Sequence, residues 1–417
     1  MEYPGVAVTI LAYRSKDTIR ACIASVLHQD YRGEVVVRVR EQAGDDEEYA
    51  ILENIAQQAS EHPEPESRSR DTVRGSPEPS LSRRGLVQGR RRIFISRGEN
   101  LGFAAGHNAL IRESEKGFVL CLNADAKLAQ DFLSRTIPFF ANPTIGALQG
   151  KLLRWDTQSG ELLRGPQQLP VLDTTGLKPL RNRRIVNRGQ GEEDRGQYDT
   201  VAPRDTRDDK SHSRDEVAGE IFGADGAAPL YRKATLEDVA IPYADFHSGG
   251  PDGDRDTEAG RRSRETLAGP LREYFDEDFF MYKEDVDLAW RFQWRGWKTL
   301  YIPEAIAWHA RGSGDSTAHS AINIIRERRK LSPTAKYYAF ANQRLMQIKN
   351  ETCRGLLRDF LPWYAKEAGA WWFALLTEQR TVPAIFRIAR LLPKMRKKRR
   401  WVMAHRKSGA NPYRWFV

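Results

Sequence analysis

Three carboxylates stand close together in a largely apolar stretch, FFMYKEDVDLAWRFQWRGW, at residues 279–297. Neighbouring carboxylates repel one another and apolar surroundings remove their solvation, so this crowding is costly unless the segment lies on the surface. On a helix, Glu284 or Asp285 could sit in a partly apolar pocket and act as a general base. The structural alternative is that Asp287 pairs with Arg291, four residues on, and that Glu284 caps the helix. Both interpretations can hold together, with one carboxylate for structure and one for chemistry.

A second group of polar residues lies where apolar strands are expected to end. The run GFVLCLNAD (117–125) reads as a strand that finishes in Asn123 and Asp125. One carboxylate and one amide at that place suit a divalent cation that in turn holds substrate phosphates. A polar strand end or a helix cap is the competing interpretation. His309 closes another apolar run, IPEAIAWHARGSG, and would be a third ligand for such a metal.

Two segments rich in small residues could let a ligand approach the backbone. NLGFAAGHNAL contains Asn100, Gly102 and Asn108, and the amides at the start of its helix could meet an anion. GADGAAPLYRK contains Asp225, which is well placed to hydrogen-bond a sugar hydroxyl. Tight packing explains the small residues of both segments equally well.

Alternating strand and helix patterns must position these residues. Continuous apolar runs are typical of strands that are buried on both faces, and apolar residues three and four apart indicate helices between them. This alternation predicts an α/β fold with a mostly parallel, Rossmann-like sheet, in which ligands bind beyond the carboxyl ends of the strands. The expected strands cover residues 6–12, 34–39, 91–98 and 117–125, and the expected helices cover residues 15–29, 47–59 and 102–115.

The rest of the chain has a different character. Polar segments at about 60–91 and 244–268 predict flexible insertions within a domain that spans residues 1–318. Residues 319–417 predict a helical extension that is basic and aromatic. Its run KMRKKRR has six basic residues out of seven, and tryptophans lie nearby. Such a combination suits the headgroup layer of an anionic membrane, although a solvated tail with packed tryptophans would look the same.

Composition limits the classes of function. Lys and Arg number 66 against 56 Asp and Glu, so the net charge of +10 favours an anionic partner such as a nucleic acid, an anionic membrane or a phosphate-bearing substrate. No nucleic-acid module is present and the densest basic run is terminal, which argues against a nucleic acid. Three scattered cysteines suggest a reducing compartment. The absence of a basic leader and of any run of eighteen apolar residues predicts a cytoplasmic protein without a spanning helix.

Taken in order, these segments resemble the family 2 glycosyltransferases of the GT-A fold. The similarity covers roughly residues 5–58, 91–240 and 270–350, and it is greatest to the bacterial rhamnosyltransferase-like branch. The motifs that carry it are VTILAYRSKDTIRACIASVLHQ, NLGFAAGHNAL, LCLNADAKL, FGADGAAPLYRK and YFDEDFFMYKEDVDLAWRFQWRGWKTLYIPEAIAWHARG. The resemblance implies an inverting transfer of a sugar from a nucleotide-diphosphate sugar to a cell-envelope glycan or a polyprenyl-linked acceptor at the inner face of the membrane.

The resemblance also implies roles for individual residues. Asp285 matches the catalytic base, with Glu284 beside it. Asp125 matches the last acidic position of the D-x-D motif that binds Mn²⁺ or Mg²⁺, with Asn123 at its first position, and His309 matches the histidine that often completes this metal site. The implied contacts to the donor come from Ala12, Tyr13, Glu41, Asn100, Gly102, Asn108, Asn123 and Asp225.

Two departures from the family pattern bear on the donor. Tyr13 precedes Arg14 where family members usually have Tyr-Asn after the first strand. The second strand usually ends in Val-Asp-Asn, whose Asp grips the nucleotide base, but here Arg40 and Glu41 take those places. Glu41 could substitute, as could Asp45 or Asp46. The alternative that follows is a non-catalytic protein that binds a sugar nucleotide or acts as a scaffold.

Overall fold

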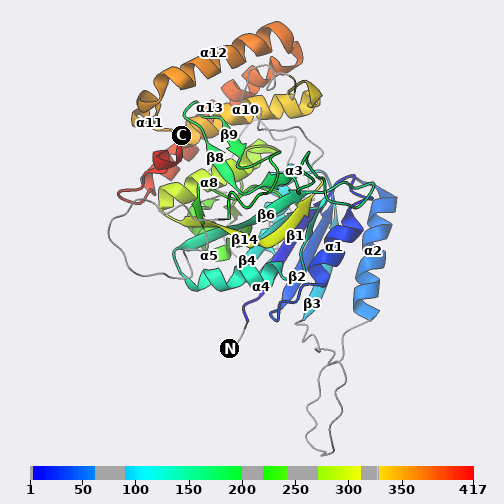
Figure 1. Cartoon of the computed structure of the whole chain (residues 1–417). Helices are drawn as coiled ribbons and strands as arrows, with labels where there is room; N and C mark the ends of the chain where they lie inside the picture. The colour runs from blue at the N-terminus through cyan, green and yellow to red at the C-terminus, as the bar shows by residue number, and fades with distance from the viewer. Residues whose placement is uncertain (1–2, 62–89, 200–218, 243–270, 311–325, 327) are drawn as a thin grey trace, which may run out of the picture.

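The fold is built on one large mixed sheet, shown in a computed structural model of the chain (Figure 1). Strand β1 illustrates why the apolar runs become central strands, because all but one of its seven residues are buried. The strands follow the order β10-β14-β6-β11-β4-β1-β2-β3, with β5 paired to β14 and β7 paired to β6. The structure describes residues 3–61, 90–199, 219–242, 271–310, 326 and 328–417.

Parallel pairing dominates this sheet, as the alternation of strands and helices predicts. Strand β1 pairs in parallel with β2 and β4, β2 pairs in parallel with β3, and β6 pairs in parallel with β14. Strand β11 runs antiparallel between β4 and β6, and β10 is antiparallel to β14. The strands are β1 (Val6–Ala12), β2 (Val35–Glu41), β3 (Arg91–Arg97), β4 (Phe118–Asn123), β5 (Ala126–Leu128), β6 (Ile145–Arg154), β7 (Leu172–Thr174), β8 (Leu177–Pro179), β9 (Ile185–Asn187), β10 (Gly219–Ile221), β11 (Leu230–Arg232), β12 (Ile241–Pro242), β13 (Arg272–Glu273) and β14 (Lys298–His309).

Helices flank the sheet, and a group of helices from the C-terminal part of the chain lies beyond one end of it (Figure 1). The α/β class and the helical C-terminal region are therefore both confirmed. The α-helices are α1 (Ile19–Leu27), α2 (Asp46–Glu61), α3 (Gly102–Arg112), α4 (Phe132–Thr136), α5 (Lys233–Val239), α8 (Glu284–Arg295), α10 (Pro333–Asn350), α11 (Cys353–Arg358), α12 (Phe360–Thr377) and α13 (Pro383–Ala404). Short 3₁₀ turns are η1 (Ile137–Ala141), η3 (Glu277–Phe279), η4 (Gln379–Thr381) and η5 (Pro412–Trp415).

The C-terminal helices share a hydrophobic cluster with α8. Trp290 and Trp294 of α8 pack in this cluster with residues of α10, α13 and the chain end. The buried members from those elements are Leu345, Met346, Leu391, Met395, Val402, Tyr413 and Phe416. Helices α10 and α13 and the chain end are thus packed against the element that carries the acidic motif.

Some local expectations need adjustment. The two segments expected to be flexible insertions lie almost entirely outside the described residues. The sequence favours Ser15 as the cap of the first helix, but the residue at the cap position of α1 is Thr18, and the Ser15 hydroxyl donates to Glu48. Among the described residues, no helix combines the length and the apolar character needed to cross a bilayer.

Candidate active site

The carboxyl ends of neighbouring strands bring the predicted polar residues to one edge of the sheet. Leu11, next to the end of β1, lies opposite Asn123 at the end of β4, and Ala12 lies opposite Glu41 at the end of β2. β14 ends at His309, whose partner across the β5 pairing is Ala126, three residues after Asn123. Parallel pairing places all of these ends on the same side, where ligands of such sheets bind.

Asp125 and His309 meet at this edge, as the sequence predicts. An oxygen of Asp125 lies 3.2 Å from His309 Nε2, and the amide nitrogen of Asn123 lies 3.3 Å from the same ring atom. His309 Nδ1 lies 2.8 Å from a carboxylate oxygen of the fully buried Asp173. Asp173 is a functional candidate that the sequence analysis missed, because it lies in a short strand far from the other motifs.

The electrostatics of this group favour a positive charge. Burial would lower the pKa of His309, but Asp125 and Asp173 outweigh it and raise that pKa to about 10. Despite the burial of Asp125, the nearby His309 holds the pKa of its carboxyl below the usual range. Surroundings that stabilise a proton on Nε2 would also stabilise a divalent cation at that point.

The residues present fit a divalent metal. Asp125 offers an oxygen and His309 offers a ring nitrogen, and both are common ligands of such ions. Asp173 on the other ring nitrogen gives the arrangement in which a carboxylate orients a metal-binding histidine. About a third of the Asp125 side chain is exposed, so substrate phosphates can reach the same position.

Asp285 lies at the start of α8 and faces the segment that joins this group to the sheet. Its Oδ2 accepts a hydrogen bond of 3.2 Å from the Gly226 amide. The next residue, Ala227, accepts a hydrogen bond of 2.9 Å from the amide of Asn123. The segment 225–227 therefore contacts both the acidic motif and Asn123, which belongs to the group formed by Asn123, Asp125, Asp173 and His309.

Burial and mutual repulsion shift the titration of this acidic motif. Burial, reinforced by the charge of Asp225, raises the pKa of Asp285 to about 6. Burial and the charge of Asp285 raise the pKa of Glu284 to about 8. Asp285 is half-buried rather than enclosed, so it can still meet a substrate. A carboxylate whose pKa is raised toward neutrality in this way is suited to remove a proton from a hydroxyl.

One of the three carboxylates, Asp287, has the structural role that its helical spacing from Arg291 predicts. Asp287 is fully buried and pairs with Arg291 at 3.0 Å, as the helical spacing predicts, and with Lys349 of α10 at 2.8 Å. Glu284 does not cap the helix, since the cap position belongs to Lys283 and no side chain caps it. Asp287 is therefore held in structural ion pairs, and within the part of the chain that the structure describes Asp285 and Glu284 have no comparable ion pair.

A strained loop sets the direction of these carboxylates. Phe280, Tyr282 and Lys283 have φ angles of 61°, 70° and 77°, in a region that residues other than glycine rarely adopt. Each such residue costs on the order of 1–3 kcal/mol and persists only where its surroundings hold it. Asn342 of α10 supplies that support, because its amide donates to the carbonyls of Phe279, Met281 and Tyr282.

Gly102 lies against the same loop for a steric reason. Its φ is 74°, and a Cβ at this position would lie 2.4 Å from the carbonyl oxygen of Phe280. The amide of the next residue, Phe103, donates to that oxygen at 2.7 Å. The glycine is required where α3 approaches the loop, so the structure assigns it a packing role beside its predicted contact with the donor.

Other predicted donor contacts are placed differently. Asn108 is fully buried, and its amide bonds to the backbone of Phe275 and to Glu277. Glu41 is also fully buried, accepts from the amides of Ala43 and Asp45, and lies 3.1 Å from Arg97. Both side chains bond to other residues of the protein, so neither is readily available to bind a ligand.

Three residues of the predicted donor set remain close to the sheet edge. Tyr13 is about half exposed directly after β1. Asn100 is exposed, and its side chain accepts from the amide of Gly102. Asp225 accepts from the side chain of Asn187 at 2.9 Å and keeps a small exposed fraction.

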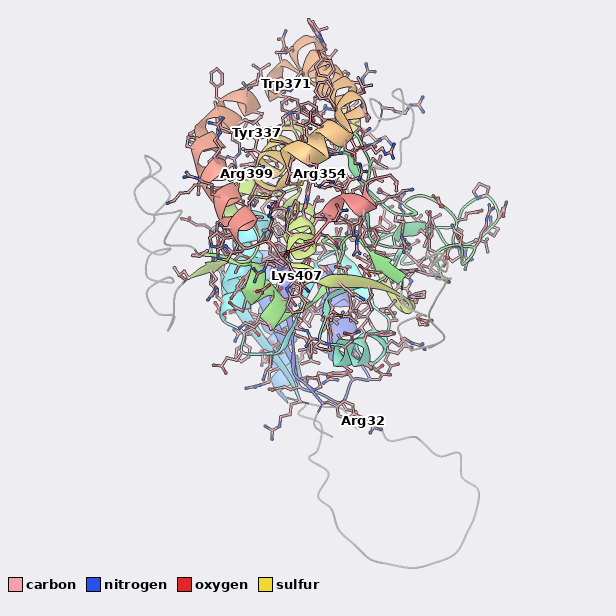
Figure 2. All side chains as sticks on the ribbon, turned by 90° about the vertical axis from the view of Figure 1, so that its left-hand side faces the viewer. Arg32, Tyr337, Arg354, Trp371, Arg399 and Lys407 are labelled. Atoms are coloured by element: carbon pink, nitrogen blue, oxygen red, sulfur yellow. The ribbon has the colours of Figure 1, made fainter. Side chains whose placement is uncertain are left out.

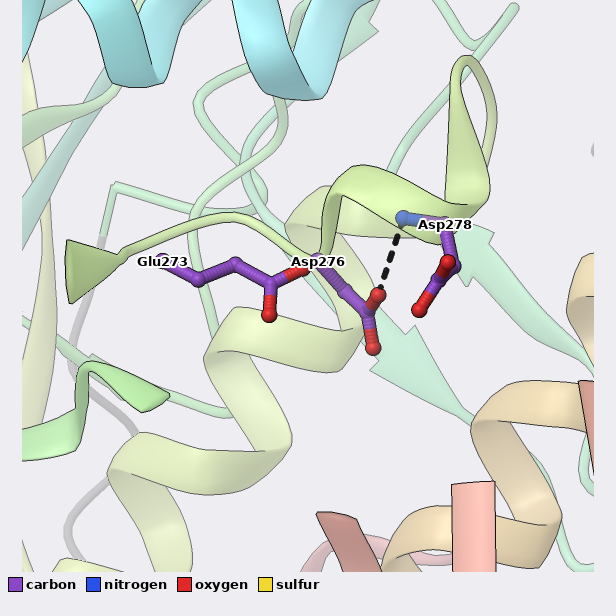
Figure 3. Close-up of side chains that lie close together, drawn as sticks. All are labelled: Glu273, Asp276 and Asp278. Carbon is purple, nitrogen blue, oxygen red and sulfur yellow. Dashed lines mark hydrogen bonds between the residues drawn. The ribbon is translucent and has the colours of Figure 1, made fainter. Parts of the chain in front are cut away.

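A separate cluster of carboxylates could be mistaken for a metal centre. Glu273, Asp276 and Asp278 lie close enough together to hold an ion (Figure 3). However, the ammonium group of Lys398 from α13 lies 2.8, 2.6 and 2.8 Å from these three carboxylates, and Lys349 pairs with Asp276 as well. Lys394 pairs with Asp278 at 2.7 Å, so three lysines supply the positive charge, and the cluster joins the C-terminal helices to the segment before the acidic motif.

Comparison with known proteins identifies the family of this chain. A model of the glycosyltransferase-like family 2 matches residues 4–331 of the chain. Among proteins with curated descriptions, none matches the chain.

Several solved structures resemble the fold at low sequence identity. The mannosyltransferase PcManGT from Pyrobaculum calidifontis, in complex with GDP-Man and Mn²⁺, is 14% identical with a TM-score of 0.40, and the match covers 95% of this chain and 89% of that one. TarS 1–349 from S. aureus, in complex with UDP-GlcNAc, is 13% identical with a TM-score of 0.44, and the match covers 99% of this chain and 90% of that one. GalNAc-T7 with UDP, GalNAc and Mn²⁺ is 11% identical with a TM-score of 0.43, covering 82% of this chain and 51% of that one.

Proposed function

The chain belongs to the glycosyltransferase-like family 2, and on that premise we propose that it is an inverting glycosyltransferase that depends on a divalent metal. Its donor would be a nucleotide-diphosphate sugar, with dTDP-rhamnose as the first candidate. Its acceptor would be a hydroxyl of a cell-envelope glycan or of a lipid-linked oligosaccharide at the inner face of the cell membrane. One observation supports this most. The Gly226 amide donates to Asp285, and its neighbour Ala227 accepts from the amide of Asn123, which lies beside Asp125 and His309.

In the proposed mechanism, Asp285 is the general base. Its carboxylate removes the proton of the acceptor hydroxyl while that oxygen attacks the anomeric carbon of the donor. The bond between the anomeric carbon and the diphosphate oxygen breaks, and the nucleoside diphosphate leaves with the bonding electrons. Attack from the face opposite the leaving group inverts the anomeric centre. The backbone amide of Gly226 holds the carboxylate in place during the transfer.

The metal would be held by Asp125 and His309, with Asn123 beside them and Asp173 orienting the ring. The chemistry that a Mn²⁺ or Mg²⁺ ion would supply there is positive charge to offset the charge that develops on the departing diphosphate. The raised pKa of His309 means that the imidazole must lose a proton to serve as a ligand. Metal binding is therefore expected to weaken as the pH falls.

Donor binding should depend on metal and on Asp125. In a thermal-shift panel of dTDP-, UDP- and GDP-sugars, one donor is expected to raise the melting temperature only when Mn²⁺ or Mg²⁺ is present. A ligand at a hundred times its Kd adds about 2.7 kcal/mol to the stability of the folded state. Asp125→Ala should remove this stabilisation, because it takes away the carboxylate that faces His309.

The matched control is Asp131→Ala, which removes a partly exposed carboxylate that pairs with Arg135 at 2.5 Å, away from Asp125 and His309. It should keep the donor-dependent shift. If no nucleotide sugar stabilises the protein in any metal, the alternative of a non-catalytic scaffold is preferred. One observation favours this alternative. The carboxylate of Glu41, at the place where the family has its base-binding Asp, already bonds to the amides of Ala43 and Asp45 and pairs with Arg97.

Transfer activity should decrease as the pH is lowered through about 6. The base works only after losing its proton, and the pKa of Asp285 is raised from 3.8 to about 6, so kcat/KM is expected to rise through pH 6 and level off above it. The measurement is a pH profile of kcat/KM with saturating metal. Repeating it at a second metal concentration separates the causes, since an acid limb due to loss of metal moves with concentration. A decrease in kcat/KM that begins only near pH 4, the ordinary pKa of an aspartate, would contradict the role of Asp285.

A further inference from the structure

Helix α12 presents an apolar face to the outside of the protein. Leu361, Tyr364, Trp372 and Leu376 recur at helical spacing, and their exposed fractions are 76%, 57%, 65% and 70%. The exposed residues of this helix include no Asp, Glu, Lys or Arg. Large exposed side chains continue onto the neighbouring helices with Leu357 of α11 at 74% and Phe386 of α13 at 75%. We name these six residues the α12 face.

The charged residues of α12 point the other way. Glu367 is buried and pairs with Arg344 of α10 at 2.7 Å, and Lys366 pairs with Glu367. On the same side, Trp363 donates to Gln347 of α10 at 3.1 Å. A surface helix in water normally turns its apolar side inward and its charges outward. Helix α12 has the reverse orientation, which is stable only if something other than water covers its outer side.

The region around the α12 face is strongly basic. Residues 379–400 contain nine Lys and Arg residues and no Asp or Glu, and two of the nine, Lys394 and Lys398, pair with Asp278. The acidic residues just before them are satisfied within the protein, since Asp359 pairs with Arg183, Glu367 with Arg344, and Glu378 with Arg328. Several cations stay exposed near both ends of α12 and along α13, namely Arg354, Arg358, Arg380, Arg390, Arg396, Lys397 and Arg400.

These elements lie at one end of the molecule. Helix α12 forms the outer edge of the structure, beyond α10 and α13 (Figure 1). Trp371 of α12 and Arg354 of α11 lie toward this end, whereas Arg32 lies at the opposite end (Figure 2). The exposed apolar side chains of α12 therefore lie at one end of the molecule, with Arg354 toward the same end.

We propose that the α12 face docks on an anionic lipid bilayer, with its apolar side chains among the upper acyl chains and the surrounding cations at the lipid phosphates. Interfacial helices bind in this way through buried apolar area and attraction to anionic headgroups. A second copy of the chain is a poorer partner, because it would bring two basic regions together. The complementary partner for an uncharged strip with a basic rim is a negatively charged membrane.

This docking connects to the proposed active site through the inner side of α12. Tyr338 of α10 stacks on Phe280 of the strained loop with ring centroids 5.1 Å apart, so the helix behind α12 contacts the loop that precedes the acidic motif. The neighbouring helix α10 holds the strained loop through Asn342. The inference rests on the proposed function in one respect, since a bilayer at this place would present a lipid-linked acceptor to Asp285.

The test is flotation of the full chain with vesicles. The protein should float with vesicles of phosphatidylglycerol and phosphatidylcholine at low salt, and much less with phosphatidylcholine alone. The double variant Leu361→Glu/Leu376→Glu should bind at least about tenfold more weakly, because each substitution removes the transfer energy of a leucine and adds a repelled charge. The matched control Phe94→Glu/Leu163→Glu changes two apolar side chains of 45% and 44% exposure elsewhere and should float like the unchanged protein.

Two further measurements separate the possible outcomes. Circular dichroism melts of both double variants show whether they fold, and the donor-dependent thermal shift of each reports on the proposed function independently of lipid. The inference is overturned if the unchanged protein stays out of the anionic vesicle fraction, or if Leu361→Glu/Leu376→Glu floats equally well. It is also overturned if light scattering shows a dimer that this variant converts to a monomer, because the face would then join two copies. Vesicle binding without any donor binding would retain the docking surface and reject the transferase.

Discussion

Replacing Asp285 by Asn is expected to lower kcat by about 10²–10⁴-fold, the usual contribution of a general base. The amide keeps the shape of the side chain but cannot take the acceptor proton. Donor affinity should change little, because the predicted metal ligands Asp125 and His309 are untouched. The measurement is steady-state transfer with the donor found in the thermal-shift panel, together with the donor-dependent shift of the variant. Loss of both activity and donor binding would point instead to a structural role.

Glu284→Gln is the matched comparison for this variant. Burial and Asp285 raise the pKa of Glu284 to about 8, so its side chain is mostly protonated at neutral pH and glutamine imitates that uncharged form. Its loss of kcat should therefore be much smaller than that of Asp285→Asn. Because Glu284 is uncharged where Asp285 titrates, and burial and Asp225 cause the raised pKa of Asp285, the acid limb of the pH profile should stay near pH 6 in this variant. If Glu284→Gln is as damaging as Asp285→Asn, the assignment of the base must be reversed.

Replacing Lys398 by Met is expected to destabilise the protein by about 3–5 kcal/mol, which is typical when one partner of a buried ion pair is removed. Lys398 is completely buried and lies within hydrogen-bond distance of Glu273, Asp276 and Asp278. Methionine fills the space but leaves the carboxylates without this ammonium group. Urea unfolding monitored by tryptophan fluorescence would measure the change, and kcat would report whether the segment before the acidic motif has moved.

Arg396→Met is the control, because it removes a positive charge from an exposed position of the same helix. Its free energy of unfolding should stay within about 0.5 kcal/mol of the unchanged protein, as is usual for surface substitutions. Equal stability of the two variants would mean that the carboxylates are neutralised without Lys398. The destabilisation by Lys398→Met should shrink as the pH falls, because Lys349 and Lys398 hold the pKa of Asp276 well below its usual range and the carboxyls become protonated in acid.

Local patterns in the sequence were sufficient for several parts of the structure. The apolar runs predicted the central strands, because a strand buried on both faces needs apolar residues throughout. Strand ends then predicted that Asp125 and His309 would meet, since parallel strands finish on the same edge of a sheet. The pairing of Asp287 with Arg291 followed from helical spacing alone.

Contacts between distant segments could not be predicted in this way. The basic run in α13 read as a membrane-facing or solvated segment, but Lys398 turns inward to Asp276, 122 residues earlier in the chain. Asp173 behind His309 and Asn342 behind the strained loop were missed for the same reason. Glu41 and Asn108 looked available for a donor, yet both are fully buried and bonded to the protein.

The sequence by itself determined the α/β architecture, the family and the residue types at the strand ends, because these depend on patterns within short segments. Only the tertiary structure decided which charged groups are paired, buried or exposed, because burial and pairing depend on segments that are far apart in the chain. Helix α12 illustrates the difference. Its sequence is visibly apolar, but only its packing on α10 shows that Glu367 faces inward while Trp372 and Leu376 face outward.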